Sequence, residues 1–240
     1  MQKPDLEKFP WNPKWGIGNY LRFAPYIDPN EIHRIIEVGS RDAIDAILLG
    51  FLYECPVYAF ECNPQGLELC YKNAEKYPYV KIVPLACWNE TQAIQFFPIV
   101  PSGDGSLPNI GASSCFSVRP GSCESAYVQG DPITVQAVRL DEWMQENETE
   151  AIDLLCLDCQ GATLKVLQGL GEKLRRVKYL ITEAYLVPAW EGEALYPEIR
   201  DYLEEKGFSP VVVKQNFSPE EKPPPAPFCD ILFINRSRTQ

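Results

Sequence analysis

The sequence predicts an α/β fold in which helices cover both faces of a mostly parallel sheet. From residue 34 onward, short apolar runs alternate with segments of helical periodicity, which is typical of successive β-α-β units. Runs such as 152–157 are apolar throughout, as expected for parallel strands that are buried on both faces. The 240 residues contain no repeat and no obvious linker, and they suffice for one large domain.

The same patterns place the individual elements along the chain. Strands are predicted at 34–39, 57–61, 80–88, 93–100, 133–140, 152–157 and 177–182, followed by a closing antiparallel pair at 208–213 and 230–234. Helices are predicted at 42–51, 65–77, 163–174 and 196–206, with a helical turn beginning at residue 141. Asn63 and Pro64 start the second helix, and Gly207 ends the last one.

The composition disfavours several classes of partner. The chain has 22 basic and 33 acidic residues, and its net charge of −11 disfavours nucleic acid backbones and anionic membranes. The first residues lack the apolar core of a signal peptide, and no run approaches the roughly 18 apolar residues of a membrane span, so a cytoplasmic location is expected.

The nine cysteines and the single histidine, His33, favour buried thiols in a reducing compartment, and no metal site is expected. Cys156 and Cys159 have the spacing of a metal or redox pair. However, they straddle the end of a predicted strand, where alternation sends them to opposite faces.

Two segments depart from the regular alternation. Residues 1–31 are rich in Trp, Pro and Tyr, and we expect them to cap the sheet edge ahead of a main domain at 32–240; the alternative is a plain N-terminal extension. Residues 101–130 contain five glycines and scattered serines. Since a loop of this length inside a compact domain usually has a function, we expect it to line or cover the pocket for an acceptor substrate, the alternative being a disordered surface excursion.

The strongest functional signal is the pair of apolar runs that lead to Gly39 and Glu61. Glu61 lies 22 positions after Gly39, the layout of a strand, a tight turn, a helix and a second strand whose carboxylate reaches a ribose. A dinucleotide needs several glycines around its pyrophosphate, which disfavours a dehydrogenase, because this turn has one glycine and Asp42 would repel a phosphate. A cationic ligand with a ribose and no phosphate fits better, and S-adenosylmethionine is such a ligand. The alternative is that Glu37 and Glu61 are ordinary strand-end carboxylates.

Acidic residues also end two later predicted strands, and ligands bind at the carboxyl-terminal edge of a parallel sheet. Asp158 is the candidate for holding the methionine end of the cofactor or the methyl acceptor, and Glu183 is the candidate base for a hydroxyl acceptor. Gln160 and Ser113 or Ser114 would orient the acceptor by hydrogen bonds. The alternative for Asp158 and Glu183 is helix N-capping.

Several blocks of the chain occur in the order and spacing of one known family. The blocks are Glu37-Val-Gly-Ser-Arg-Asp42, Phe60-Glu-Cys-Asn-Pro64, Leu85-Ala86, Leu140-Asp141, residues 152–162, Val166-Leu-Gln-Gly169 and Ile181-Thr-Glu183. Over roughly residues 32–236 the chain resembles FkbM-type methyltransferases. The resemblance implies S-adenosylmethionine as cofactor and a Rossmann-like class I methyltransferase fold, with a mostly parallel seven-strand sheet that includes one antiparallel strand. It also implies methylation of a hydroxyl oxygen on a glycan or small natural product.

The matching blocks also imply which residues form the site. The cofactor would be bound by Glu37, Gly39, Ser40, Asp42, Glu61, Cys62, Ala86 and Asp158, and the catalytic residues would be Asp158, Gln160 and Glu183. Residues 40–44 depart from the family's usual Ala-Asn-x-Gly, and Gln160 and Thr163 stand where the family often has glutamates. Gln160 can hydrogen-bond but cannot take a proton.

Because of these departures, alternatives stay open. N- or carboxyl-methylation of a peptide is one, and a catalytically inactive binding module that keeps the fold is another. The acceptor is therefore expected to be a small molecule, a glycan or a peptide, and a homodimer is also left open.

Overall fold

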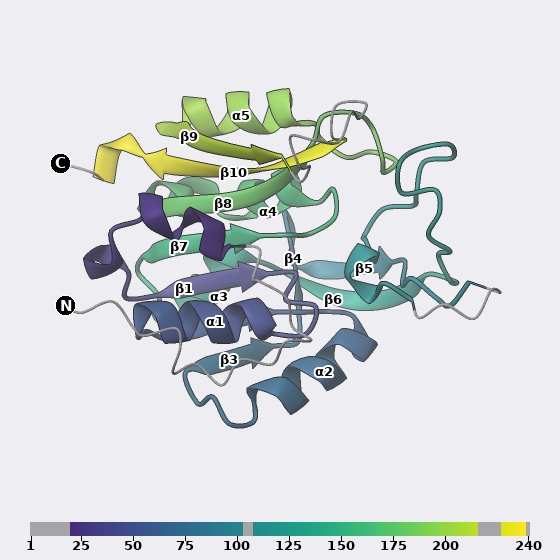
Figure 1. Ribbon diagram of the computed structural model, residues 1–240, viewed down its shortest axis with the longest axis horizontal. Coiled ribbons are helices and arrows are strands. Elements are labelled where there is room, and N and C mark those ends of the chain that lie inside the picture. Colours follow the sequence, from purple (N-terminus) through teal and green to yellow (C-terminus); the bar gives the residue numbers. More distant parts are fainter. Residues whose placement is uncertain (1–19, 103–107, 216–226, 239–240) are drawn as a thin grey trace.

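Figure 1 shows the computed structural model of the chain, in which residues 20–102, 108–215 and 227–238 are described. A seven-stranded sheet has the strand order β3-β2-β1-β7-β8-β10-β9. Its strands are β1 (Ile35–Val38), β2 (Val57–Phe60), β3 (Val80–Val83), β7 (Ile152–Leu157), β8 (Val177–Tyr185), β9 (Phe208–Gln215) and β10 (Phe228–Asn235). β10 is antiparallel to both of its neighbours, and the other pairs are parallel. This arrangement confirms the predicted sheet with one antiparallel strand in its last pair.

Helices cover both faces of this sheet, as predicted (Figure 1). They are α1 (Ile44–Tyr53), α2 (Pro64–Ala74), α3 (Leu140–Glu146), α4 (Thr163–Gly169) and α5 (Tyr196–Glu205). Ile35 of β1 packs in the core under α1, whereas Ile36 packs in the opposite core with residues of α3, α4 and α5. Successive residues of β1 therefore enter different cores, which explains why Ile35 and Ile36 are both apolar. None of the helices in the described ranges has both the length and the apolar character needed to cross a membrane.

The structure contains a second, smaller sheet that the sequence does not predict. The expected strand at 80–88 is broken at Pro84, and its second half, β4 (Ala86–Trp88), joins β6 (Ile133–Arg139) and β5 (Gln92–Phe96). Pro84 has no amide hydrogen for a strand ladder, and the Leu85 amide turns back to the Val83 carbonyl at 2.9 Å. The sheet change moves β4 away from β3 and makes room for a cavity at the edge of the main sheet.

Two predicted helices have different bounds. The helix expected at 42–51 begins at Ile44, because Ala43 has a left-handed φ of +61°. The helix expected at 163–174 ends at Gly169, and a 3-10 helix at Gly171–Arg176 follows, with a φ of +49° at Gly171. Gly169 packs so close to β4 that a Cβ atom there would lie 2.1 Å from the Trp88 carbonyl oxygen.

Residues 20–31 pack on the face of the sheet that carries α1, and not over an edge. Phe23 is fully buried in that core, and Glu31 pairs with Lys178 of β8 at 2.6 Å. Trp11 and most of the expected cap lie outside the described residues, so the division of the chain at residue 31 stays a prediction.

Candidate active site

The turn after β1 has backbone conformations that few residues adopt. Gly39 has a φ of +86°, and Arg41 follows with a φ of +54°. A Cβ atom on Gly39 would lie 1.8 Å from the carbonyl oxygen of Asp158, so only glycine fits there. The amides of Gly39 and Ser40 both donate to the Phe60 carbonyl at 3.0 Å, which fastens the turn to the end of β2. Strain concentrated in one turn is typical of functional sites.

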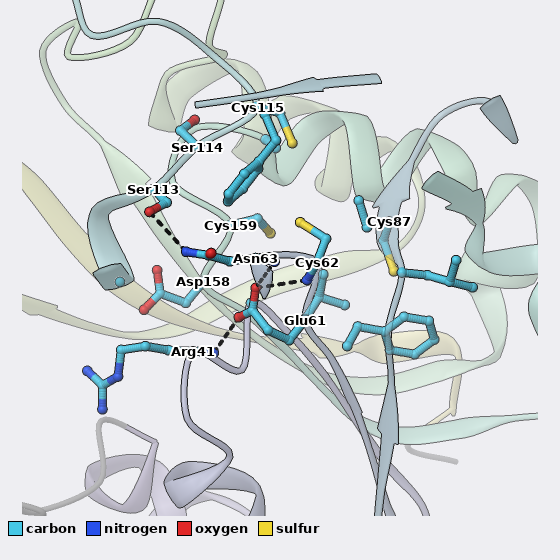
Figure 2. Close-up of a pocket in the computed structure, with 18 of the residues that line it drawn as sticks. Arg41, Glu61, Cys62, Asn63, Cys87, Ser113, Ser114, Cys115, Asp158 and Cys159 are labelled. Carbon is cyan, nitrogen blue, oxygen red and sulfur yellow. Dashed lines mark hydrogen bonds between the residues drawn. The ribbon is translucent and has the colours of Figure 1, made fainter. Parts of the chain in front are cut away.

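Glu61, directly after β2, holds the same turn from the other side (Figure 2). Its carboxylate accepts from the backbone amides of Arg41 at 2.6 Å, Cys62 at 2.8 Å and Asn63 at 2.6 Å. A carboxylate has about four acceptor positions, so three amides leave capacity for a ligand hydroxyl. Burial raises the pKa of Glu61, and the hydrogen bonds from the amides oppose that rise. The side chain is thus fixed by the fold before any ligand arrives.

A first cavity lies beside Glu61, at the ends of β1, β2 and β7 (Figure 2). Its apolar lining consists of Val38, Phe60, Leu85, Ala86, Phe96, Ile110 and Ala162. Glu61, Asn63 and Asp158 add polar groups to the lining. An apolar slot with a carboxylate at its side suits adenosine, because the base has apolar faces and the ribose carries hydroxyls.

Four thiols line this cavity, and the sequence alone does not indicate that they lie together. They are Cys62 after β2, Cys87 in β4, Cys115 in the loop and Cys159 after β7 (Figure 2). Burial raises the pKa of each thiol, that of Cys115 to about 12, so all four are neutral at physiological pH. Cys87 lies in an apolar run, whereas the other three follow strands or lie in the loop, and the fold brings the four together.

The thiols provide a direct test of where adenosine binds. Cys62, Cys115 and Cys159 are partly exposed, whereas Cys123 is exposed and lines neither cavity. S-adenosylmethionine at ten times its Kd should slow alkylation of the first three by N-ethylmaleimide about tenfold. Alkylation of Cys123 should be unaffected. Peptide mass spectrometry measures each rate, and equal rates with and without cofactor would place adenosine elsewhere.

A second cavity adjoins the first and shares Gly39, Arg41, Gly111 and Asp158 with it. Its charged and amide lining consists of Glu37, Arg41, Asp45, Asn109, Glu124, Asp158, Gln160 and Glu183, and its aromatic lining of Tyr20, Tyr127, Tyr185 and Phe228. The structure thus adds Asp45 and Glu124 to the acids predicted from the sequence. Asp45 lies in α1 and Glu124 in the loop, where nothing in the sequence distinguishes them from surface acids.

Two of the predicted acids are not at strand ends. Glu37 is the third residue of β1, and Glu183 lies inside β8, which continues to Tyr185 and pairs Glu183 with Asp230. Neither Asp158 nor Glu183 caps a helix, since the N-caps of α4 and α5 are other residues. The capping alternative is therefore wrong for both acids.

Gln160 bridges the two acids proposed for catalysis. Its Nε2 donates to Asp158 Oδ1 at 2.7 Å and to Glu183 Oε1 at 3.3 Å. Gln160 has a φ of +44° and Gly161 one of +89°, so a second strained turn presents the amide. Burial, with Asp230 nearby, raises the pKa of Asp158 to about 6, and burial next to Asp158 raises the pKa of Glu183 well above its usual range. An amide that donates to both acids offsets part of their mutual repulsion.

Two predicted cofactor residues are hydrogen-bonded within the turn. The Ser40 hydroxyl donates to the buried Glu37 carboxylate. Asp42 lines neither cavity, because its carboxylate accepts from Arg41 Nε at 3.0 Å and from the Ile44 amide at 3.2 Å, at the start of α1. The structure therefore gives Asp42 a structural role, and its contact with the cofactor stays a prediction.

The two predicted acceptor serines lie on the first cavity and not on the second. Ser113 Oγ accepts from the Ile99 amide at 2.9 Å and from Asn63 Nδ2 at 3.3 Å, and Ser114 Oγ donates to the Gln160 carbonyl at 2.7 Å. Ser113 thus ties the loop to Asn63, and Ser114 ties it to the strained turn at Gln160. Contact of either serine with the acceptor stays a prediction.

The raised pKa of Asp158 gives the site a pH dependence. Burial raises this pKa from 3.8 to about 6, so the acid contributes stability below pH 3.8 that is lost as the pH rises through about 6. A bound cation favours the charged acid, so binding S-adenosylmethionine at pH 6 should release protons and strengthen as the pH rises. Calorimetry in two buffers of different ionisation enthalpy measures the release, which Asp158→Asn should reduce. Affinity that falls between pH 5.5 and 7.5 would contradict this assignment.

The residues present fit a sulfonium cofactor with a ribose. Glu61 has acceptor capacity for ribose hydroxyls, the first cavity has an apolar lining for the base, and the acids around Asp158 attract a cationic methionine end. Together with the strand order, this site defines a class I methyltransferase that uses S-adenosylmethionine.

Comparison with known proteins identifies the family. The Methyltransferase FkbM domain matches residues 37–210, and the chain belongs to this family. It is 29% identical over 171 residues to "2-O-methyltransferase NoeI" of Sinorhizobium fredii, covering 70% of each chain. It is also 33% identical over 72 residues to "Methyltransferase sdnD" of Sordaria araneosa, covering 30% of this chain and 26% of that protein.

Two solved structures support the fold. Fibrillarin of Methanococcus jannaschii, a pre-rRNA processing protein, aligns with a TM-score of 0.51 at 14% identity, over 93% of this chain and 76% of its own. TrmK of M. capricolum, in complex with S-adenosylhomocysteine, aligns with a TM-score of 0.50 at 12% identity, over 90% of this chain and 67% of its own. At such identities the likeness concerns the fold alone.

Proposed function

We propose that this methyltransferase acts on a hydroxyl oxygen of a glycan or a small natural product. The observation that carries the proposal is the lining of the second cavity, where carboxylates and an amide face aromatic rings next to Asp158. Carboxylates and amides accept hydrogen bonds from hydroxyls, and aromatic side chains combine an apolar face with a polar tip. The 2-O-methyltransferase activity in the name of the Sinorhizobium relative supports an oxygen acceptor.

In this proposal Glu183 removes the proton of the acceptor hydroxyl. Glu183 Oε1 already accepts from Gln160, which leaves Oε2 to take the proton. Asp158, which lines both cavities, orients the acceptor toward the cofactor, and Gln160 holds the two acids in place. The bound cofactor supplies the methyl group, and the chain's main contribution is alignment of the acceptor oxygen with it.

The charge of the second cavity bears on the alternatives. Five acidic side chains and one basic side chain, that of Arg41, line it, and this excess of acids disfavours a peptide carboxylate as the acceptor. The net charge of −11 disfavours nucleic acid acceptors in the same way. N-methylation of a peptide amine is the alternative that the charge does not disfavour.

The test is a methyl-transfer screen with radiolabelled S-adenosylmethionine against oligosaccharides, hydroxylated natural products and peptides. We expect the label on a hydroxyl oxygen, located by mass spectrometry. Glu183→Gln should lower the rate about 100-fold or more, the usual range for a general base. Glu205→Gln, on the exposed side of α5, is the matched control and should be silent. Label found on peptide nitrogen alone would refute the proposal.

We also propose a cytoplasmic location, supported by the thiols. All nine cysteines are free, as expected for a protein from a reducing compartment. The homodimer stays a prediction, which light scattering on the purified protein would test.

A further inference from the structure

Glu124 is a buried acid in the loop, with Tyr185 of β8 as its partner. It is 8% exposed and lines the second cavity. Glu124 Oε1 lies 3.2 Å from the Tyr185 hydroxyl, and the same hydroxyl lies 3.2 Å from Gln160 Oε1. Because Gln160 Nε2 reaches Asp158 and Glu183, one hydrogen-bonded chain runs from the loop to both acids of the proposed catalytic group.

The direction of each hydrogen bond follows from counting protons. The Gln160 nitrogen must face Asp158 and Glu183, because its oxygen there would meet two other oxygens. Gln160 Oε1 then needs a donor, and the Tyr185 hydroxyl lies within reach. That hydroxyl has a single proton. Glu124 can therefore bond to Tyr185 at the same time only by donating, that is, as a neutral acid.

The surroundings of Glu124 favour the neutral form. Burial raises its pKa, and the hydrogen bonds with Tyr185 and Cys123 oppose only part of that rise. Glu183 and Glu193 are near enough for an ionised Glu124 to raise the pKa of both, so a neutral Glu124 avoids repulsion between like charges. The Cys123 thiol lies 3.8 Å from Glu124 Oε1 and is itself neutral, since burial raises its pKa to about 11.

We propose that neutral Glu124 donates to Tyr185, that Tyr185 in turn donates to Gln160, and that this chain fixes the Gln160 amide across Asp158 and Glu183. Glu124 is then a positioning residue that the loop contributes to the acceptor side of the site. The inference rests on the proposed function for its purpose, since a fixed Gln160 leaves Glu183 Oε2 directed to the acceptor. The hydrogen-bonded chain itself is testable without any acceptor.

The first measurement is the protonation state of Glu124. In protein labelled with ¹³C at the glutamate carboxyls, the resonance missing from Glu124→Gln identifies Glu124. We expect this carboxyl to be neutral at pH 7 and to ionise only at higher pH. Exposed Glu68 of α2, identified in the same way from Glu68→Gln, serves as the solvent-exposed reference resonance. A Glu124 carboxyl that is already ionised at pH 7 would overturn the proposal.

The second measurement is hydrogen exchange of the Gln160 side-chain amide, identified by its absence in Gln160→Ala. Glu124→Ala and Tyr185→Phe should each speed exchange at least tenfold, and the double variant should match the single ones because they break one chain. Glu124→Gln should stay within twofold of wild type, because its amide can still donate to Tyr185. Unchanged exchange in Glu124→Ala, or effects that multiply in the double variant, would overturn the proposal.

Binding of S-adenosylmethionine separates positioning from loss of structure. Its Kd should stay within about threefold in Glu124→Ala, Glu124→Gln and Tyr185→Phe, because neither Glu124 nor Tyr185 lines the first cavity. Loss of binding in Glu124→Ala with retained binding in Glu124→Gln would instead assign Glu124 a role in holding the loop and overturn the positioning role. If the wild-type protein binds cofactor but methylates no hydroxyl, the proposed function fails. The exchange rates then still show whether the hydrogen bonds from Glu124 through Tyr185 to Gln160 exist.

Discussion

Gly39→Ala is expected to destabilise the folded protein by about 3–5 kcal/mol and to abolish binding of S-adenosylmethionine. The new Cβ atom would lie 1.8 Å from the carbonyl oxygen of Asp158, and Gly39 has a φ of +86° that alanine adopts only with strain. Relief of the clash must push β1 away from β7, which separates the turn from the acid that lines both cavities. Urea unfolding and calorimetry measure the two effects.

The chain offers a matched control that isolates the clash. Gly121 has a φ of +77°, but a Cβ atom there would meet nothing within 4 Å. Gly121→Ala therefore suffers only the backbone cost of about 1 kcal/mol, and it should bind cofactor normally. Equal destabilisation by the two substitutions would show that the contact with Asp158 is not the reason why position 39 requires glycine.

Glu61→Ala is expected to weaken binding of S-adenosylmethionine at least 100-fold. A ribose hydroxyl would lose a charged acceptor, which costs about 1.5–3 kcal/mol. The amides of Arg41, Cys62 and Asn63 would also lose their common partner, so the turn itself would loosen. Isothermal calorimetry of the folded variant gives the affinity.

Two further variants interpret that result. Glu61→Gln should bind nearly as weakly as Glu61→Ala, because one end of its amide is a donor that would face amide donors. Glu68→Ala removes an exposed glutamate from the same part of the chain and should leave the affinity unchanged. Cofactor affinity in Glu61→Ala within threefold of wild type would exclude Glu61 as the ribose acceptor.

The sequence alone supports the central part of the fold and the cofactor side of the site. The apolar run before Gly39 predicts a buried strand. Glu61 places a carboxylate at the end of a second buried strand, where acidic residues are rare. The role of both residues can be inferred from the local sequence, because parallel pairing of β1 and β2 brings the two strand ends together.

The rest depends on contacts that no local pattern reveals. The second sheet forms because β4 leaves the main sheet at Pro84 and pairs with β6, about 50 residues later. Glu124 and the four thiols come from separate segments, and each looks like an ordinary surface acid or buried apolar residue in its own segment. Asp42, by contrast, has a conspicuous position in the sequence, but it serves the start of α1.

A crystal structure with S-adenosylhomocysteine tests the central claim most directly. The two-cavity arrangement predicts the adenine among the thiols of the first cavity, the ribose on the Glu61 carboxylate and the sulfur beside Asp158, facing Glu183 across the second cavity. An adenine outside the first cavity, or a ribose with no contact to Glu61, would contradict it.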